Sequence, residues 1–296
     1  MTALLPMAQT PAPELAPAPR RGALREVGTV LAAVVLIAIV VSVVLAGVIG
    51  PHGYDEQDVI NSYAHPTWFG HHPLGTDNLG RDVLVRTLYG GRPALAISAV
   101  AAVLATALGL GLSLLAVLGG RFWDAFLGRI ADIQLAIPTI LLALVVLAFA
   151  GSGTKPLIVV LTVGAWVLTF RILRSHAGRI AALPYIEAAR LSGAGPGSVL
   201  WRHVLPACAP LAAVGLTLNF SSTLVLESSL GYLGLGVQPP KPDWGQMVAT
   251  GQAQLAGAWW ISLIPGAFIV LTVVAVQILG DRIADRLTLI TDGDVA

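Results

Sequence analysis

The chain has 296 residues, of which 56% are hydrophobic and only 11% are charged, and its mean hydropathy is +0.80. Soluble domains carry about 25% charged residues, so this composition excludes a water-soluble globular protein and, equally, a disordered chain. Its 17 Lys and Arg nearly balance 16 Asp and Glu, which gives no general basic field for nucleic acid. The single cysteine, Cys208, excludes an internal disulfide framework and a multi-cysteine metal site. The composition indicates an integral membrane protein.

Apolar stretches long enough to cross a bilayer recur along the chain. A helix needs about 20 mostly apolar residues to span the hydrocarbon core. Charge-free stretches of this kind predict an all-α protein with six spans, at residues 27–49, 93–120, 133–154, 156–170, 207–226 and 257–280. The fourth is short, and a snorkelling Arg171 extends it to Leu173.

The N-terminal segment is rich in Pro and Ala. Such a composition buries nothing, so we predict a disordered cytoplasmic tail over residues 1–26. Three arginines precede the first span, as in a signal peptide, but its apolar core exceeds the roughly 7–15 residues of a cleavable signal. We therefore interpret this span as an uncleaved anchor.

The basic residues fall mainly on one side of the predicted spans. With the N-terminus inside, 12 of the 17 Lys and Arg lie in inside segments and 5 in outside segments. Cytoplasmic loops retain positive charge, so the distribution predicts that both termini are cytoplasmic.

Several kinds of site are missing from the sequence. It contains no Gly-x-x-x-x-Gly-Lys-Ser/Thr phosphate loop, so we expect no ATP binding by that route. The adjacent His71 and His72 fit a surface loop better than a metal site, since their side chains diverge on a regular element. No intramembrane cluster of acids and bases indicates a proton relay. A membrane protein with neither a relay nor a nucleotide site is expected to take its energy from another subunit.

The longest predicted inside loop covers residues 171–206. Proline suits the first position of a helix and glycine the position just past its end, so residues 184–192 are predicted to form a short helix that stops before Gly193. Glu187 near its start and Arg190 near its end favour the helix dipole. A turn at 195–197 and a second short helix over 198–204 should follow, before Pro206 opens the fifth span.

Composition alone favours an ordinary capped loop, but the spacing of its residues closely resembles the EAA loop of binding-protein-dependent ABC permeases. The matching or neighbouring positions are Glu187, Ala188, Ala189, Arg190, Gly193, Leu205 and Pro206. The departure is Val204, where the family usually has isoleucine. In that family the loop forms a coupling helix that docks on a cytoplasmic ATPase.

A second motif lies in the predicted outside segment after the first span. It could be only a capped loop, with residues 82–89 as a short helix ended by Gly90. The string resembles the H-x-L-G-T-D-x-x-G-R-D-V-L segment of oligopeptide, dipeptide and nickel permeases, specifically their C-type subunit. The positions concerned are Gly75, Thr76, Asp77, Gly80, Arg81 and Asp82.

A third stretch, residues 227–245, resembles the family's E-x-x-L-x-F-L-G-L-G-x-Q-P-P-x-P-x-W-G, with Tyr232 in place of phenylalanine. Residues 280–285 resemble its C-terminal G-D-x-x-x-D, so the likeness covers about residues 27–286. Glu227 is either an interfacial acid or a residue that faces the translocation path. The predicted divisions are a first helix with its outside segment over 27–92 and a permease domain over 93–296, with the EAA loop at 184–206.

The resemblance implies a non-catalytic permease subunit with six spans and the fold of type I ABC importers. Its partners would be a homologous second permease, two ATPase subunits that bind ATP and Mg²⁺, an extracytoplasmic solute-binding protein and the lipid bilayer, and it would hold no cofactor or metal itself. The solute would be a peptide, with a nickel chelate, glutathione or another small solute as alternatives. A stand-alone ion-coupled secondary transporter is the rival, although the chain lacks the internal repeat and midplane charges common in that class.

Overall fold

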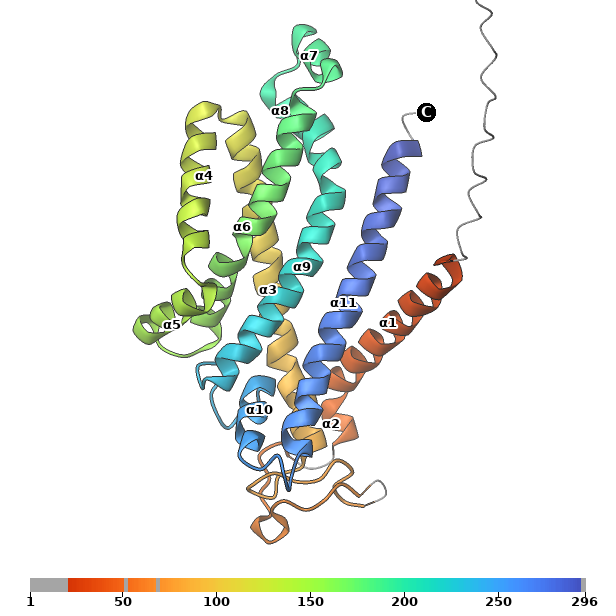
Figure 1. Cartoon of the computed structure of the whole chain (residues 1–296), viewed down its shortest axis with the longest axis vertical. Coiled ribbons are helices and arrows are strands. Elements are labelled where there is room, and N and C mark those ends of the chain that lie inside the picture. The colour runs from red at the N-terminus through yellow and green to blue at the C-terminus, as the bar shows by residue number, and fades with distance from the viewer. Residues whose placement is uncertain (1–20, 51–52, 68–69, 294–296) are drawn as a thin grey trace, which may run out of the picture.

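The structure is a computed structural model that describes residues 21–50, 53–67 and 70–293 (Figure 1). Helices make up most of it, and no strand occurs within these described ranges. The elements in chain order are α1 (Arg21–Val44), α2 (Ala46–Ile49), η1 (Val59–Asn61), α3 (Val83–Leu118), α4 (Arg121–Ala136), α5 (Thr139–Ala150), α6 (Thr154–Ala181), α7 (Pro184–Leu191), α8 (Pro196–Val199), η2 (Leu200–Val204), α9 (Leu205–Tyr232), α10 (Trp244–Gln252) and α11 (Trp260–Gly293).

The long helices form an elongated bundle. In Figure 1, α3, α6 and α9 occupy its middle, α4 and α5 lie on one side, and α11 and α1 lie on the other. The small helix α7 caps one end, and the loop segment before α3 lies with α10 at the opposite end. Five described helices are long and apolar enough to cross a membrane, and the bent pair α4–α5 makes a sixth crossing if counted as one span. The predicted all-α membrane fold is confirmed.

Small and polar residues hold the three central helices together. A side chain at Gly109 of α3 would collide with the α6 backbone, 2.9 Å from the carbonyl oxygen of Trp166. The buried amide of Asn219 on α9 donates hydrogen bonds of 2.9 Å to Thr106 of α3 and to Thr169 of α6. Close backbone approach and interhelical hydrogen bonds are the usual means of helix association in lipid.

Near the N-terminus, the helix bounds differ from the predicted ones in two places. Helix α1 begins at Arg21, so residues 21–26 are helical, while residues 1–20 of the predicted tail lie outside the described ranges. Asp82 caps a helix as expected, but Gly90 does not end it, and α3 continues through the predicted division at residues 92 and 93. The glycines serve packing instead, since a Cβ at Gly91 would lie 2.8 Å from the ring of Trp244.

The third predicted span, residues 133–154, is not one helix. The chain is helical in α4, becomes extended at Ile137 and turns by 88° into α5. Pro138 explains the break, because proline disfavours the helical conformation in the residue before it.

The second helix of the loop also differs from the prediction of residues 198–204. Helix α8 begins earlier, at Pro196, and continues through the π-helical turn η2 into α9. The wider turn fits a backbone that approaches Pro206, which has no N–H to donate.

Candidate functional site

The loop at one end of the bundle has the predicted helix followed by a glycine turn. Helix α7 has Pro184 in its first turn and is closed by Ser192, so the predicted bounds are correct within one residue. Gly193 follows with φ +92°, in the left-handed region. The N–H of Gly193 donates to the carbonyl of Arg190, and the N–H of Ala194 donates to the carbonyl of Ala189, both at 3.0 Å. These two bonds form a Schellman motif, which requires a residue that tolerates positive φ.

One buried side chain fixes α7 on the bundle. Ile186 is fully buried in an apolar cluster with Leu173 and Ala177 of α6 and with Val204 and Cys208. The other face of α7 points away, with Glu187, Ala188 and Arg190 exposed and Ala189 partly so. The helix is therefore anchored by one buried side chain while its other face is exposed.

Sequence reasoning did not select the large apolar side chains that surround this face. Leu191 is 85% exposed, Trp201 is 70% exposed and Tyr185 is 50% exposed. Tyr185 is held at the edge of the His203 ring, with 5.8 Å between the ring centres. Clustered exposed apolar groups mark interaction surfaces in folded proteins. A mixture of large apolar residues with charges in a short turn-rich loop is the signal that could have identified them. We call Tyr185, Glu187, Arg190, Leu191 and Trp201 the α7 surface.

The remaining loop residues join the α7 surface to the bundle. Leu205 and Pro206 lie in the first turn of α9, directly after η2. A displacement of α7 would therefore act on α9 through Val204 and the turn before Leu205 as well as through Ile186.

At the opposite end, the carboxylate of Asp77 organises the second motif. It accepts hydrogen bonds from the backbone N–H groups of Leu79 and Arg81, at 2.9 and 3.0 Å. It also binds the side chain of Arg81 at 2.7 Å and lies 3.5 Å from that of Arg86. Asp82 caps α3 by accepting from the N–H of Val85 at 3.0 Å, and its other oxygen lies 3.0 Å from Nδ1 of His72.

The other motif residues pack the segment closely. The hydroxyl of Thr76 accepts from the N–H of Ala64 at 2.8 Å. Gly75 and Gly80 have φ of +78° and +72°, and a Cβ at Gly80 would overlap the carbonyl of Asp58. In this conformation the motif fixes the entry into α3, which is a structural role.

The third motif encloses Glu227. Its side chain is fully buried on α9 and lies against Asp243, whose Oδ1 caps α10 by accepting from the N–H of Gln246 at 2.9 Å. It lines neither of the two cavities described next. The alternative that Glu227 faces the translocation path stays a prediction; in this structure its side chain is buried beside Asp243.

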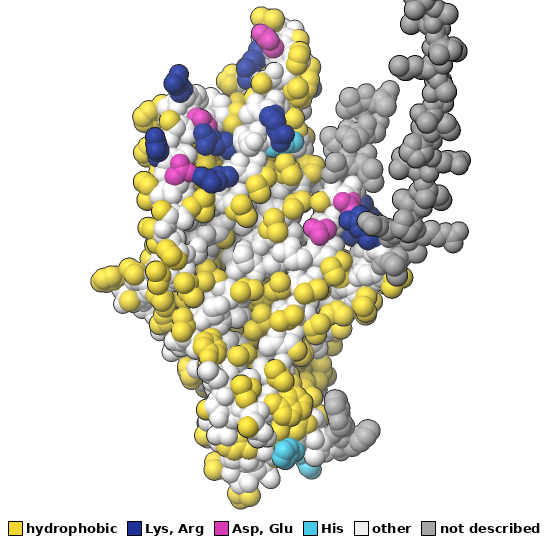
Figure 2. All heavy atoms as spheres, in the orientation of Figure 1, with side chains coloured by type: hydrophobic (Ala, Val, Ile, Leu, Met, Phe, Trp, Pro, Cys, Tyr) yellow, Lys and Arg dark blue, Asp and Glu magenta, His cyan; other side chains and the backbone are white. Residues whose placement is uncertain are grey.

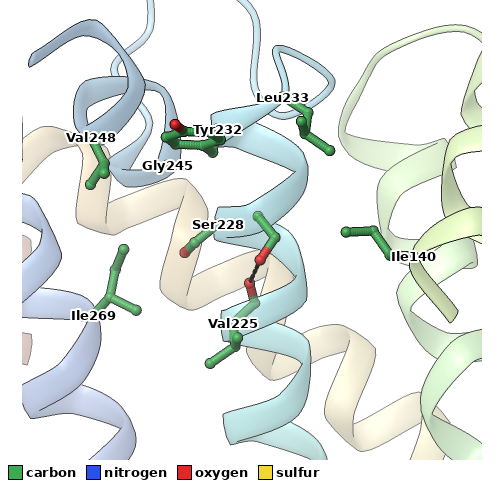
Figure 3. Close-up of a pocket in the computed structure, with 9 residues that line it drawn as sticks. Ile140, Val225, Ser228, Tyr232, Leu233, Gly245, Val248 and Ile269 are labelled. Carbon is green, nitrogen blue, oxygen red and sulfur yellow. Dashed lines mark hydrogen bonds between the residues drawn. The ribbon is translucent and has the colours of Figure 1, made fainter. Parts of the chain in front are cut away.

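Two cavities follow one side of α9. The first, of about 380 Å³, lies near α10, and Figure 3 shows α9 between Ile140 of α5 and Val248 and Ile269 on the other side. The second, of about 620 Å³, lies further along the bundle and shares Val225 and Ser229 with the first. Its polar lining consists of Thr139, Asn219, Ser221, Ser222, Thr223, Ser229 and Gln277. We call these two cavities the α9 groove. The sequence analysis did not identify it, although polar residues within an apolar span could have indicated it.

The sequence favoured a surface loop over a metal site for the adjacent His71 and His72. No group of three or more His, Cys, Asp or Glu side chains is placed to hold a metal ion among the described residues. His72 instead pairs with Asp82.

Known proteins resemble this chain over most of its length. Residues 106–289 match the family described as binding-protein-dependent transport system inner membrane component. The chain belongs to this family. The permease is 34% identical over 256 residues to the di/tripeptide transport system permease protein DppC of Pseudomonas aeruginosa, covering 85% of this chain and 84% of that protein. It is 35% identical over 237 residues to a protein of Brucella suis biovar 1 named as a candidate peptide permease, covering 79% and 78% of the two chains.

A solved structure has the same fold. The permease superposes on an inward-facing MetNI methionine ABC transporter with a TM-score of 0.56 and 24% identity, covering 68% of this chain and 96% of that chain. The permease is therefore a multi-pass membrane subunit of an ABC importer with the type I fold, and its family implies ATPase and solute-binding partners. A stand-alone secondary transporter is not favoured.

Proposed function

We propose that this permease forms one half of the translocation path of an ATP-driven importer of short peptides. The names of its relatives support peptides over nickel chelates or glutathione, since a di/tripeptide permease and a candidate peptide permease align with most of the chain. The α9 groove supports the path, because its two cavities share lining residues, present hydroxyl and amide groups among apolar side chains, and have no charged residue in their described lining. Groups of this kind can bind peptide backbones of any sequence through hydrogen bonds.

Helix α7 is the proposed coupling element. Its exposed face, its rigid attachment through Ile186 and its connection to α9 suit a part that transmits movement from an ATPase to the groove. ATP can shift the permease between its two conformations only by having different affinity for them. The permease itself would bind neither ATP nor a metal and would catalyse nothing, while two ATPase subunits supply nucleotide and Mg²⁺ chemistry.

The proposed assembly pairs this permease with a homologous second permease, and a binding protein delivers the solute at the α10 end. Under this proposal the α7 end and both termini are cytoplasmic. Figure 2 shows Lys and Arg side chains gathered on one face toward the α7 end, which supports this orientation by the positive-inside rule.

Reconstitution tests the proposal. The two permeases, the ATPases and the binding protein would be placed in liposomes, and uptake of a labelled dipeptide and tripeptide would be compared with glutathione and a nickel chelate. We expect ATP-dependent uptake of the peptides. Uptake of only the chelate or only glutathione would overturn the peptide assignment and leave the importer assignment standing.

A further inference from the structure

A basic groove lies between α4 and α6, beneath α7, with a volume of about 870 Å³. Five arginines line it, Arg121 from α4, Arg171, Arg174 and Arg179 from α6, and Arg190 from α7, and Asp124 is the only acidic residue of its lining. In Figure 2, Lys and Arg side chains gather over this part of the bundle. The groove is distinct from the α9 groove, with which it shares no lining residue.

Carboxylates on the permease neutralise only part of this charge. Arg174 pairs with Asp124 at 2.5 Å, and Arg171 pairs with Asp132. Arg121, Arg179 and Arg190 have no carboxylate partner within the part of the chain that the structure describes, and all three are exposed. Guanidinium groups bind phosphate oxygens in a bidentate manner, so three unpaired arginines around one groove favour a phosphate ligand.

Exposed aromatic residues, one of them a tryptophan, lie on α4 beside this groove. On α4, immediately after Arg121, Phe122 is 71% exposed, Trp123 is 39% exposed and Phe126 is 47% exposed. The rings of Phe122 and Phe126 stack nearly parallel, 6.0 Å apart. Membrane proteins enrich Trp and Tyr at the interface between the hydrocarbon core and water, so Trp123 indicates that the start of α4 lies near that depth. A phosphate bound beside the first turn of α4 would therefore be part of a lipid.

We propose that this groove binds the headgroup of an anionic phospholipid from the leaflet at the α7 end. Unpaired arginines on α4, α6 and α7 would hold the phosphate, and the acyl chains would lie along the apolar surface of the bundle. Basic pockets between membrane helices are the places where anionic headgroups are recognised. Because Arg190 belongs to α7, the lipid would also link the α4–α6 groove to the α7 surface.

Native mass spectrometry of the assembled transporter in mixed micelles tests the proposal. Phosphatidylglycerol and phosphatidylcholine would be compared for wild type, Arg121→Gln and Arg179→Gln, with Arg129→Gln as the matched control. Arg129 is exposed on the same helix but does not line the groove. We expect wild type and Arg129→Gln to retain phosphatidylglycerol over phosphatidylcholine. Each groove variant should bind it about fivefold more weakly, and the two changes combined about thirtyfold.

Three results would overturn the proposal. Equal binding of the two lipids by wild type would show that the groove does not select anionic headgroups. An equal loss of phosphatidylglycerol binding in Arg129→Gln would show that the effect comes from the overall surface charge and not from the groove. Loss of the ATPases from the groove variants with unchanged phosphatidylglycerol binding would assign the groove to a protein contact. Competition by inorganic phosphate separates the two phosphate sources, because displacement of the lipid by phosphate at low concentration would favour the free ion.

Discussion

The indole N–H of Trp260, at the start of α11, donates a 3.0 Å hydrogen bond to the carbonyl oxygen of Thr76, 184 positions earlier in the chain. Both groups are buried, and Gly75 packs so closely that a Cβ there would lie 2.7 Å from the indole nitrogen. This contact fastens the motif segment before α3 to the last long helix.

Trp260→Phe should loosen that segment while leaving the bundle assembled. The change leaves the buried carbonyl of Thr76 without its donor, which costs about 2 kcal/mol. Limited proteolysis of residues 53–82 in detergent would measure it, and we expect faster cleavage. Trp259→Phe is the control, because Trp259 is 49% exposed and its ring contacts Trp260 without a hydrogen bond to Thr76. Equal cleavage rates in the two variants would contradict the fastening role.

Local chemistry explains which features the sequence could predict. Pro184 and Gly193 specify the start and end of α7 by backbone geometry alone, and both were correctly placed. Gly90 and Gly91 could likewise end a helix, but α3 continues through them. These two glycines instead allow close packing against Trp244 and Val43, which are distant in sequence. The buried position of Glu227 depends likewise on Asp243, which only the fold brings beside it.

The proposed orientation in the membrane can be tested by thiol labelling. In a Cys208→Ala variant, a cysteine at the exposed position Ser198 should resist an impermeant thiol reagent in intact cells and react in opened cells. A cysteine at Lys241, exposed near the α10 end, is the matched control and should react in both. Labelling of position 198 in intact cells would reverse the proposed orientation.

Gly193→Val should displace the α7 surface without unfolding the spans. A β-branched residue is disfavoured at φ +92°, and the left-handed conformation costs about 1–2 kcal/mol for residues other than glycine. Gly197→Val is the control, since Gly197 lies in α8 without a positive φ and has similar open space. We expect weaker co-purification of the ATPases with Gly193→Val at normal membrane levels. Unchanged co-purification would show that the left-handed turn at Gly193 does not position the α7 surface.

Ser222→Trp should obstruct the α9 groove. Ser222 is exposed and lines the larger of its two cavities, so an indole there would fill much of the space. Uptake should fall strongly while the ATPases still bind. Leu216→Trp is the control, because Leu216 faces a different cavity beside α1 and α3. If Ser222→Trp transported normally, the path would have to lie elsewhere.

Glu187→Lys should abolish transport and solute-stimulated ATP hydrolysis while the permease still inserts and assembles. Glu187 is exposed on α7, near its N-terminus, so reversing its charge costs the helix only about 0.3–1 kcal/mol. If the ATPase surface that faces Glu187 is basic, a lysine at this position would be placed against like charges, which costs several kcal/mol. Glu187→Gln, which removes the charge without reversing it, should keep part of the activity. Liposomes containing all partners would provide both readouts. Full transport by Glu187→Lys would exclude α7 as the coupling element, whereas failed insertion would show that Glu187 stabilises the loop itself.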